Sequence, residues 1–399
     1  MKLENKQILL GVTGGIAAYK ALELVRLLTK QNAVVNVVMT KNAEQFIGKV
    51  SFQTLSGNPV LTDTFDLSSG AEIKHISLPD NASIAVIAPA TANFIGKLAH
   101  GIADDLLSTM MLAMTKPVLI APSMNVHMYN NPIVQDNINK LKRYGYHFIE
   151  PNEGWLACGY EGKGRLAEPE QIVEEIESLL TIKDLKGKTI LVSAGPTREY
   201  IDPVRFISNP SSGKMGYAIA RAARMRGADV ILVSGKVNIK PPYGVKYIEV
   251  ESAKQMFEQI SGLADRVDCI IMSSAVSDFT PSKTNQQKIK KTMEYLDIRL
   301  ERTQDIISSV AKNKGNKIIV GFAAETENIE HYAKEKLIQK NLDMIVANNV
   351  TEKGSGFGAD TNKALIVFRD GTVEDIPLMR KVDLADVILD RVSRLFGSK

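Results

Sequence analysis

Cysteine is scarce in this sequence, with only two residues among 399. Two cysteines are too few to build a disulfide scaffold or a structural zinc site. Long apolar runs are also missing near the N-terminus, where a short run over residues 7–10 leads directly into glycines. This pattern favours neither a signal peptide nor a membrane span. We therefore expect a cytoplasmic protein with no membrane partner.

A strong excess of one charge is absent as well. The net charge is +4 and no basic block is interleaved with aromatic side chains, so nucleic acid is not an expected partner. The composition, 44% hydrophobic and 24% charged, is that of an ordinary globular protein. Since 399 residues are long for a single hydrophobic core, we expect two domains.

The sequence does contain one α/β pattern, which occurs twice. In the first half, the pattern predicts short apolar strands over residues 7–10, 34–39, 83–88 and 117–120, and an amphipathic helix over 16–30. The segment KTILVSAGPT, which includes Thr189, repeats the pattern of the opening segment KQILLGVTGG. We therefore predict an α/β protein with two doubly wound parallel-sheet domains, over residues 1–184 and 185–399.

The fingerprint of a dinucleotide site is absent from both halves. The turn over residues 11–15 has the spacing GxxGG rather than GxGxxG, and the next strand ends in Thr40 rather than in an acid. The predicted strand over residues 229–234 also ends without an acid. A pair of NAD-dependent oxidoreductase domains is therefore disfavoured, and a mononucleotide such as FMN is favoured. A glycine turn before a helix suits a phosphate, although a helix-cap turn without a ligand stays open.

Polar residues follow several predicted strands, at the edge where ligands of open α/β sheets bind. Asn125 follows the strand over residues 117–120, and Thr91 follows the strand before it. We expect a catalytic amide at Asn125, while a turn with a methionine packed beneath it is the alternative. Ser108 and Thr109 lie near the start of a helix, where they suit either a phosphate contact or ordinary capping.

Cys158 lies in a glycine-rich segment, with four glycines among the twelve residues 154–165. This composition predicts a mobile flap that carries a thiol over a pocket, and a surface loop with an idle thiol is the alternative. Cys269 lies in an apolar run and is expected in the core. His75, a lone histidine before a strand, is by itself more often structural than catalytic.

The loop after the strand that begins at Thr189 ends in the segment Ser-Ser-Gly-Lys over residues 211–214. This segment fails as a P-loop, because Ser208 occupies the first glycine position and Met215 the position of the magnesium-binding hydroxyl. It still offers a nest for an anion, with Arg198, Arg205 and Asn209 nearby.

Two further segments of the second half carry polar groups. Ala275 and Asp278 follow the strand over residues 269–274, again at a ligand edge. Lys288 begins the run Lys-Ile-Lys-Lys, which suits a triphosphate or a charged acyl intermediate. A solvated charged face is the alternative for this run.

Taken together, these segments resemble the bacterial bifunctional phosphopantothenoylcysteine decarboxylases/phosphopantothenate–cysteine ligases of coenzyme A biosynthesis. The segments GVTGGIAAYK, APATAN, PSMNVHMY and ACGYEGKGRL are similar to the flavin-containing cysteine decarboxylases. The family pattern PxMNxxMW has a tryptophan where Tyr129 stands. The resemblance covers essentially the whole chain, and it implies a flavodoxin-like FMN domain followed by a Rossmann-like ligase domain.

For the first half, the resemblance implies three catalytic residues. His75 matches the active-site histidine, Asn125 the asparagine that binds the substrate carboxylate, and Cys158 the flap cysteine that supplies a proton late in the reaction. FMN oxidises the substrate thiol, which creates an electron sink for loss of CO₂. The residues expected at FMN are Gly14, Gly15, Thr40, Thr91, Ser108 and Thr109.

For the second half, the resemblance implies activation of 4′-phosphopantothenate by CTP. An acyl-cytidylate and pyrophosphate form, and the amine of cysteine then attacks. Asn209 is implied in forming the acyl-cytidylate, and Lys288 in holding the nucleotide or supporting amine transfer. The remaining residues expected at CTP are Ala275, Asp278, Phe322, Lys336 and Lys340. Mg²⁺ or Mn²⁺ is expected with the triphosphate. The preference for CTP over ATP comes only from the resemblance.

The resemblance also implies a homo-oligomer. Flavin sites are expected at subunit contacts, with trimers assembled into a dodecamer and the ligase halves paired as dimers. A regulatory flavoprotein that has lost turnover is the alternative function. The complete set of His75, Asn125 and Cys158 argues against it, because a purely regulatory protein need not retain all three.

Overall fold

The computed structural model describes residues 3–64, 74–155, 159–290, 295–325, 327–349, 356 and 358–397. The chain divides into two compact units, residues 1–181 and 182–399. No helix within the described ranges is long and apolar enough to span a bilayer.

The first unit is built on a parallel sheet with the strand order β2-β1-β3-β4-β5. Its strands are β1 (Gln7–Val12), β2 (Val34–Met39), β3 (Ile84–Ala90), β4 (Val118–Pro122) and β5 (His147–Phe148). All seven residues of β3 and all five of β4 are buried, as expected for parallel strands covered on both faces. This is the flavodoxin-like order, whose ligand site lies at the switch point between β1 and β3.

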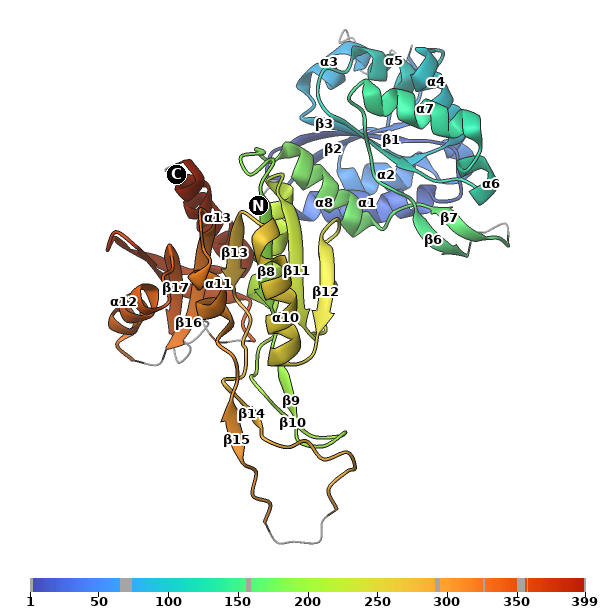
Figure 1. The fold of residues 1–399 in the computed structure, drawn as a ribbon. Helices are drawn as coiled ribbons and strands as arrows, with labels where there is room; N and C mark the ends of the chain where they lie inside the picture. The colour runs from blue at the N-terminus through green and yellow to red at the C-terminus, as the bar shows by residue number, and fades with distance from the viewer. Residues whose placement is uncertain are drawn as a thin grey trace. The chain divides into compact units, whose positions relative to one another are not determined.

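Helices cover both faces of this sheet (Figure 1). On one face lie α1 (Ala18–Lys30), α2 (Lys49–Ser56) and α8 (Pro169–Leu180). On the other lie α3 (Lys74–Asn81), α4 (Ala92–His100), α5 (Leu106–Ala113) and α7 (Pro132–Arg143). Buried side chains of β1, β3 and β4 form one core with α4, α5 and α7. The short helix α6 (Val126–Tyr129) and the antiparallel pair β6 (Asn152–Trp155) and β7 (Glu161–Arg165) complete the unit.

The second unit contains an eight-stranded sheet of order β12-β11-β8-β13-β16-β17-β18-β19. The parallel strands are β8 (Thr189–Ala194), β11 (Asp229–Gly235), β12 (Lys246–Val250), β13 (Cys269–Met272), β16 (Ile318–Glu325) and β17 (Met344–Asn349). An antiparallel extension adds β18 (Thr361–Phe368) and β19 (Val373–Arg380). Numbered along the chain, the parallel part has the Rossmann order 3-2-1-4-5-6, with its switch point between β8 and β13.

Two hydrophobic cores lie on opposite faces of the second sheet. One face packs against α9 (Lys214–Met225) and α13 (Lys381–Gly397). The other packs against α10 (Ala253–Leu263), α11 (Ile306–Lys312) and α12 (Ile329–Gln339). Cys269 is fully buried, as predicted. The predicted fold class is therefore confirmed in both units.

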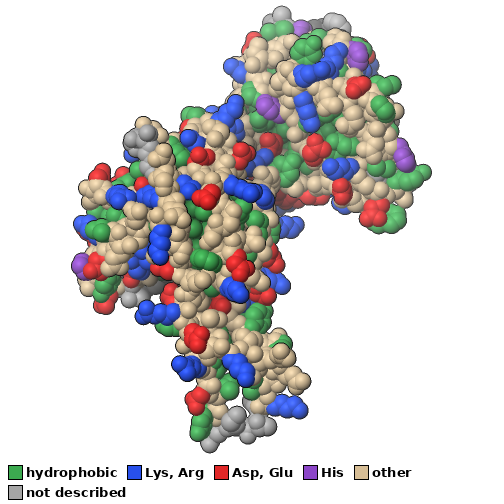
Figure 2. Space-filling view, viewed as in Figure 1, with side chains coloured by type: hydrophobic (Ala, Val, Ile, Leu, Met, Phe, Trp, Pro, Cys, Tyr) green, Lys and Arg blue, Asp and Glu red, His purple; other side chains and the backbone are tan. Residues whose placement is uncertain are grey.

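The sequence patterns did not predict the short antiparallel pairs. In the second unit these are β9 (Arg198–Tyr200) with β10 (Phe206–Ser208), and β14 (Phe279–Pro281) with β15 (Leu300–Arg302). Figure 1 shows them on an extension from the end of the sheet. Each strand has only three residues, too few for an alternating pattern to stand out. Figure 2 shows charged side chains of both signs interspersed over the visible face of each unit.

Candidate functional site

A cavity of about 1260 Å³ opens at the carboxyl edge of the first sheet, around the switch point between β1 and β3. Pockets for small ligands usually measure roughly 300–1,000 Å³, so this cavity has room for a cofactor together with a substrate. Of the residues predicted at FMN or at the substrate, the cavity wall includes Gly14, Gly15, Thr40, Thr91 and Asn125.

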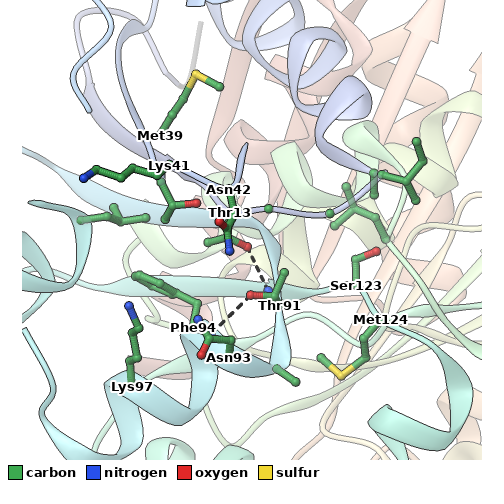
Figure 3. Close-up of a pocket in the computed structure, with 18 of the residues that line it drawn as sticks. Thr13, Met39, Lys41, Asn42, Thr91, Asn93, Phe94, Lys97, Ser123 and Met124 are labelled. Carbon is green, nitrogen blue, oxygen red and sulfur yellow. Dashed lines mark hydrogen bonds between the residues drawn. The ribbon is translucent and has the colours of Figure 1, made fainter. Parts of the chain in front are cut away.

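The glycine turn after β1 is held against the end of β3 by Thr13. The Thr13 hydroxyl donates to the Pro89 carbonyl at 2.7 Å. It also accepts from the Thr91 amide at 3.0 Å (Figure 3). Gly14 is required by packing, because a Cβ there would lie 2.4 Å from the Cβ of Asn42. A Cβ on Gly15 would meet only Thr91, at 3.8 Å. The two glycines therefore have different roles, and Gly15 is the one beside open space.

The N-terminus of α1 faces this cavity without a side-chain cap. Its N-cap residue, Ala17, lines the cavity and has no side-chain acceptor for the first backbone donors. The Ala18 and Lys20 amides donate to the Gly15 and Ala17 carbonyls at 2.9 and 3.0 Å, so a phosphate here would rely on the other amides of this turn and on the helix dipole. Lys20 lies on the same wall, and its Nζ pairs with Glu168 at 2.9 Å. Exposed Lys41 provides a further cation at the wall.

The remaining wall combines apolar side chains with small polar groups (Figure 3). Thr91 caps α4 by accepting from the Phe94 amide at 3.3 Å, which fixes the start of that helix beside the cavity. The apolar members of the wall include Met39, Phe94, Leu107, Met124 and Trp155. An apolar wall with a few polar groups suits a planar aromatic ring that carries hydrogen-bonding edges.

Asn125 lies between β4 and α6. Its Oδ1 accepts a hydrogen bond from the His127 amide at 2.8 Å, so Asn125 caps α6 and its amide is fixed in rotation. The side chain is half-buried and lines the cavity. The polar amide that the sequence predicts after the strand over residues 117–120 thus lies at the carboxyl end of β4, on the cavity wall.

Most described residues of the glycine-rich segment 154–165 belong to the strand pair β6–β7. Strand β7 docks on the loop after β4 through a bond from the Met124 amide to the Gly164 carbonyl at 3.0 Å. A Cβ on Gly164 would lie 2.2 Å from the Met124 carbonyl oxygen, and one on Gly162 would lie 2.8 Å from Val126, so these two glycines permit close packing. Cys158 lies outside the described residues, and the mobile flap stays a prediction.

Ser108 and Thr109 do not line the cavity. The Ser108 hydroxyl donates to the Asp105 carboxylate and the Thr109 hydroxyl to the Asp105 carbonyl, both at 2.8 Å, in a capping box at the start of α5. Capping, the alternative stated for these residues, thus accounts for both hydroxyl groups, and a phosphate contact stays a prediction.

Lys97, which the sequence patterns did not single out, forms a charged cluster with two aspartates on the cavity wall. Lys97 Nζ lies 2.6 Å from Asp104 and 3.0 Å from Asp105. Burial lowers the pKa of Lys97, but the two carboxylates outweigh it and raise the pKa overall. Burial likewise raises the pKa of Asp105, yet the bonds from the Ser108 amide and from Lys97 bring it below its usual value.

His75 does not line the cavity either. It lies on α3, which packs against α5, and it is half-buried. Within one chain the structure therefore brings Asn125 to the cavity but not His75.

In the second unit, predicted site residues meet at the switch point between β8 and β13. The Asn209 side-chain amide donates to the Ala275 and Val276 carbonyls at 3.3 and 3.1 Å. Pro196, in the loop after β8, pairs with Ala275 in an isolated bridge. The loops after the two strands are thus joined at Ala275.

Thr197 connects three segments at this point. Its buried hydroxyl accepts from the Ser277 amide at 3.0 Å, and its carbonyl accepts from the Ser208 hydroxyl at 2.7 Å. Ser193 and Ser274 are joined by their hydroxyl groups at 2.8 Å. The sequence showed these residues only as small polar groups at strand ends, so the network itself depends on strand order.

The other residues predicted at CTP occupy separate positions. Lys336 pairs with Glu325, and Lys340 Nζ lies 3.2 Å from Asp305. Phe322 packs against the core below β16. Asp278 and Lys288 are exposed. Within the described ranges no group of three or more His, Cys, Asp or Glu side chains is placed to hold a metal ion.

Comparisons with known proteins match each unit separately and the chain as a whole. Residues 1–181 match the family described as Flavoprotein, and residues 185–395 match the DNA/pantothenate metabolism flavoprotein C-terminal domain. The coenzyme A biosynthesis bifunctional protein CoaBC of Bacillus subtilis (strain 168) is 50% identical over 397 residues, 98% of each chain. Its namesake from Escherichia coli (strain K12) is 42% identical over 404 residues, covering 100% of this chain and 99% of the other. A solved C-terminal domain of a CoaBC protein is 41% identical, with a TM-score of 0.48, and covers 54% of this chain and 100% of its own.

Proposed function

The chain belongs to the family of bifunctional coenzyme A biosynthesis proteins, and from that premise we propose how its residues divide the two reactions. The protein is a phosphopantothenate–cysteine ligase and a phosphopantothenoylcysteine decarboxylase. Its second unit ligates 4′-phosphopantothenate to cysteine. Its first unit, a flavoprotein that uses FMN, decarboxylates the product to 4′-phosphopantetheine.

FMN is proposed to occupy the cavity of the first unit. The single observation that carries this proposal is the cavity of about 1260 Å³ between the uncapped N-terminus of α1 and the loop that presents Asn125. The α1 donors beside Gly15 suit the phosphate, and the wall that includes Met39, Phe94 and Trp155 suits the flavin ring. Thr40 and Thr91 would contact the polar edges of the cofactor.

The chain's own residues orient the substrate and move its protons. When bound, FMN supplies the two-electron oxidation of the substrate thiol that makes loss of CO₂ feasible, and it later returns the electrons. Asn125, whose amide is fixed by the His127 bond, would hold the substrate carboxylate at the carboxyl end of β4. Cys158 would return a proton after CO₂ has left. The strands β6 and β7, which precede and follow this cysteine in the sequence, are docked on Met124 of the cavity wall.

His75 is proposed to act in the cavity of a second copy of the chain. It does not line its own cavity, and the neighbouring Ile76 side chain is 44% exposed. A subunit contact would bury this apolar group and would bring the histidine to a neighbouring site. This assignment accounts for a catalytic role at a residue that is remote from Asn125 within one chain. A homo-oligomer in the cytoplasm follows as part of the proposal.

In the second unit, the proposed nucleotide is CTP, accompanied by Mg²⁺ or Mn²⁺. Asn209, held by its bonds to the Ala275 and Val276 carbonyls, would support formation of the acyl-cytidylate. Asp278 and Phe322 would contact the nucleotide, while Lys288, Lys336 and Lys340 would neutralise its phosphates. Lys336 and Lys340 have carboxylate partners, which would keep both cations extended beside β16 and α11.

A mass-resolved time course tests the proposed order of reactions. Purified protein saturated with FMN is mixed with 4′-phosphopantothenate, cysteine, CTP and Mg²⁺, and products are followed by mass. We expect the cysteine adduct first and 4′-phosphopantetheine afterwards, with CMP and pyrophosphate formed in step with the adduct. Replacing CTP by ATP should slow adduct formation, and equal rates would contradict the proposed nucleotide. Loss of adduct formation on chelation of divalent ions would support the metal.

A further inference from the structure

A buried carboxylate lies at the turn between β9 and β10. Asp202 is 0% exposed, and its Oδ1 accepts from the Val204 and Arg205 amides, both at 2.8 Å. Its Oδ2 pairs with Arg205 Nη1 at 2.9 Å. Burial tends to raise the pKa of Asp202, but the surrounding backbone donors and the Arg205 charge hold it below its usual value. Asp202 is therefore ionised at neutral pH.

The same ion pair binds both polar backbone groups of Ile289. The Ile289 amide donates to Asp202 Oδ2 at 3.1 Å, and Arg205 Nη1 donates to the Ile289 carbonyl at 3.2 Å. Ile289 lies between Lys288 and Lys290 in the lysine run. A charge-assisted pair of bonds to one residue is strong and fixes direction as well as position.

Two further bonds align this segment with the hairpin turn. The Asn285 amide donates to the Ile201 carbonyl at 2.9 Å, and the Thr284 hydroxyl donates to the Tyr200 carbonyl at 3.1 Å. Residues 284–289 thus run along the hairpin, on the extension that Figure 1 shows beside β9 and β14. Figure 2 shows Lys and Arg side chains along this extension.

The other end of the hairpin holds Asn209. Ser208, the last residue of β10, donates to the Thr197 carbonyl at 2.7 Å, and Asn209 follows it with its bonds to the end of β13. One short hairpin, residues 198–208, therefore contacts the lysine run at its turn and leads into Asn209 at its base. A change at the turn alters the geometry between Lys288 and Asn209.

We propose that Asp202 is a positioning residue for the ligation reaction: by binding the Ile289 peptide, it directs Lys288 toward the acyl-activation site that contains Asn209. This inference rests on the role proposed above for Lys288. Lys288 has an exposed side chain, so its own surroundings do not fix its direction. The Asp202–Arg205 pair, in which the carboxylate is buried and the arginine side chain is partly exposed, supplies that constraint through the backbone.

Asp202→Asn breaks this contact selectively. The asparagine oxygen can keep the Oδ1 bonds to the Val204 and Arg205 amides, while its NH₂ group replaces the acceptor that Ile289 and the Arg205 side chain use. We expect ligation kcat/KM for CTP to fall by about 10- to 100-fold. Decarboxylation of supplied 4′-phospho-N-pantothenoylcysteine should stay unchanged, which reports an intact chain.

A double-mutant cycle with Lys288→Gln separates positioning from general structure. If Asp202 acts through Lys288, Asp202→Asn lowers ligation in the parent protein but causes no further loss in the Lys288→Gln background. Two independent losses that multiply would overturn the inference. An unchanged ligation rate in Lys288→Gln alone would instead remove the proposed role of Lys288, so the two failures are distinguishable.

Limited trypsin digestion gives a readout that does not depend on activity. Loss of the Ile289 bonds should speed cleavage after Lys288 and Lys290 several-fold, because a released segment fits a protease more readily. Asp383→Asn is the matched control, since Asp383 also pairs with an arginine three residues away, Arg380, on an exposed helix start. Equal cleavage in Asp202→Asn and Asp383→Asn would contradict the proposal. If Asp202→Asn does not fold, Arg205→Gln tests the same contact, because it removes the bond from the Arg205 guanidinium to the Ile289 carbonyl.

Discussion

Two asparagines, Asn125 and Asn209, lie in loops near the carboxyl edges of the two parallel sheets, Asn125 after β4 and Asn209 beside the loop after β13. Each side-chain amide is held by backbone groups: Asn125 Oδ1 accepts from the His127 amide, and Asn209 Nδ2 donates to the Ala275 and Val276 carbonyls. A fixed amide needs little reorganisation when a ligand binds, which is the preorganisation that an efficient site requires. Because Asn209 Nδ2 already donates to two carbonyls, Asn209 presents its Oδ1, which suits a hydrogen-bond donor rather than a carboxylate. At the scale of single residues, the two proposed sites therefore follow the same principle.

The proposed role of Cys158 gives a prediction at the same scale. Cys158→Ser should still release CO₂ from the substrate but should stall at the oxidised enethiol, because a serine hydroxyl is a far weaker proton donor than a thiol. Mass analysis of single-turnover products measures this directly. Ligation rate and FMN content serve as controls and should match those of the parent. Normal output of 4′-phosphopantetheine would contradict the proton-donor role.

At the scale of elements, the β6–β7 pair depends on glycine for its docking. Gly164 has φ +157°, and its Cα approaches the Met124 backbone so closely that a Cβ would lie 2.2 Å from the carbonyl oxygen. The adjacent bond from the Met124 amide to the Gly164 carbonyl, 3.0 Å long, requires this approach. The pair is therefore positioned by backbone contact with the loop that presents Asn125.

Gly164→Ala should displace β7 from that loop. Since small displacements of a catalytic group are costly, we expect decarboxylation to fall by about 10- to 100-fold while ligation stays unchanged. Steady-state rates of the two half-reactions, measured on one preparation, provide the test. Gly48→Ala is the control in the same unit, because a Cβ there meets nothing within 4 Å and φ is −77°. Equal losses in both variants would refute the docking argument.

At the scale of the whole molecule, the proposed assembly predicts complementation between two inactive variants. His75→Asn should abolish decarboxylation and spare ligation. Asn125→Asp keeps the acceptor for the His127 amide but repels the substrate carboxylate, so it should also be inactive. If His75 serves a neighbouring subunit, mixed oligomers regain intact sites, about one quarter of the total for equal random mixing. Two affinity tags isolate the mixed oligomers for assay. If the mixed oligomers recover no decarboxylase activity, His75 does not act in the cavity of a neighbouring subunit.

The pH dependence of stability follows from several ion-paired carboxylates. The pKa of Asp184 is lowered chiefly by hydrogen bonds from Arg226, and the pKa of Asp305 is lowered by the Ser308 amide and Lys340 despite its burial. The pKa of Asp105 is also lowered despite burial, by the Ser108 amide and Lys97. A carboxyl group whose folded pKa lies below its unfolded value of 3.8 stabilises the fold above that value, and this contribution is lost as pH falls through the folded pKa.

We therefore expect Tm to change little between about pH 5 and 8 and to fall below about pH 4. Lys97 affects the pH dependence of stability in the opposite direction. Because its pKa in the folded protein is raised above 10.5, Lys97 stabilises the fold below pH 10.5, and this contribution is lost as pH rises through the folded pKa. Calorimetry from below about pH 4 to above pH 10.5 measures both limbs. Asp105→Asn should flatten part of the acid limb, and a steep loss of Tm between pH 5 and 7 would contradict the assignment.

The sequence by itself determined most strands of both sheets, the turn over residues 11–15 and the strand-end positions of Asn125 and Ala275, whereas β5 and β12 were not predicted. These features depend on local patterns: an apolar run that is too short for a helix, a helical periodicity after it, and the small or polar residues that end a strand. Each such pattern spans only about ten or twenty consecutive residues. It can therefore be identified without knowing which other segments pack against it.

Only the tertiary structure decided which of these local features meet. Asp202 and Ile289 are 87 positions apart, and their contact depends on the strand order that brings the loops after β8 and β13 together. The same order joins Asn209 to Ala275, whereas the bonds of Ser108 to Asp105 keep that hydroxyl out of the cavity. Contacts of this kind depend on side chains brought together by packing, which no periodicity along the chain encodes.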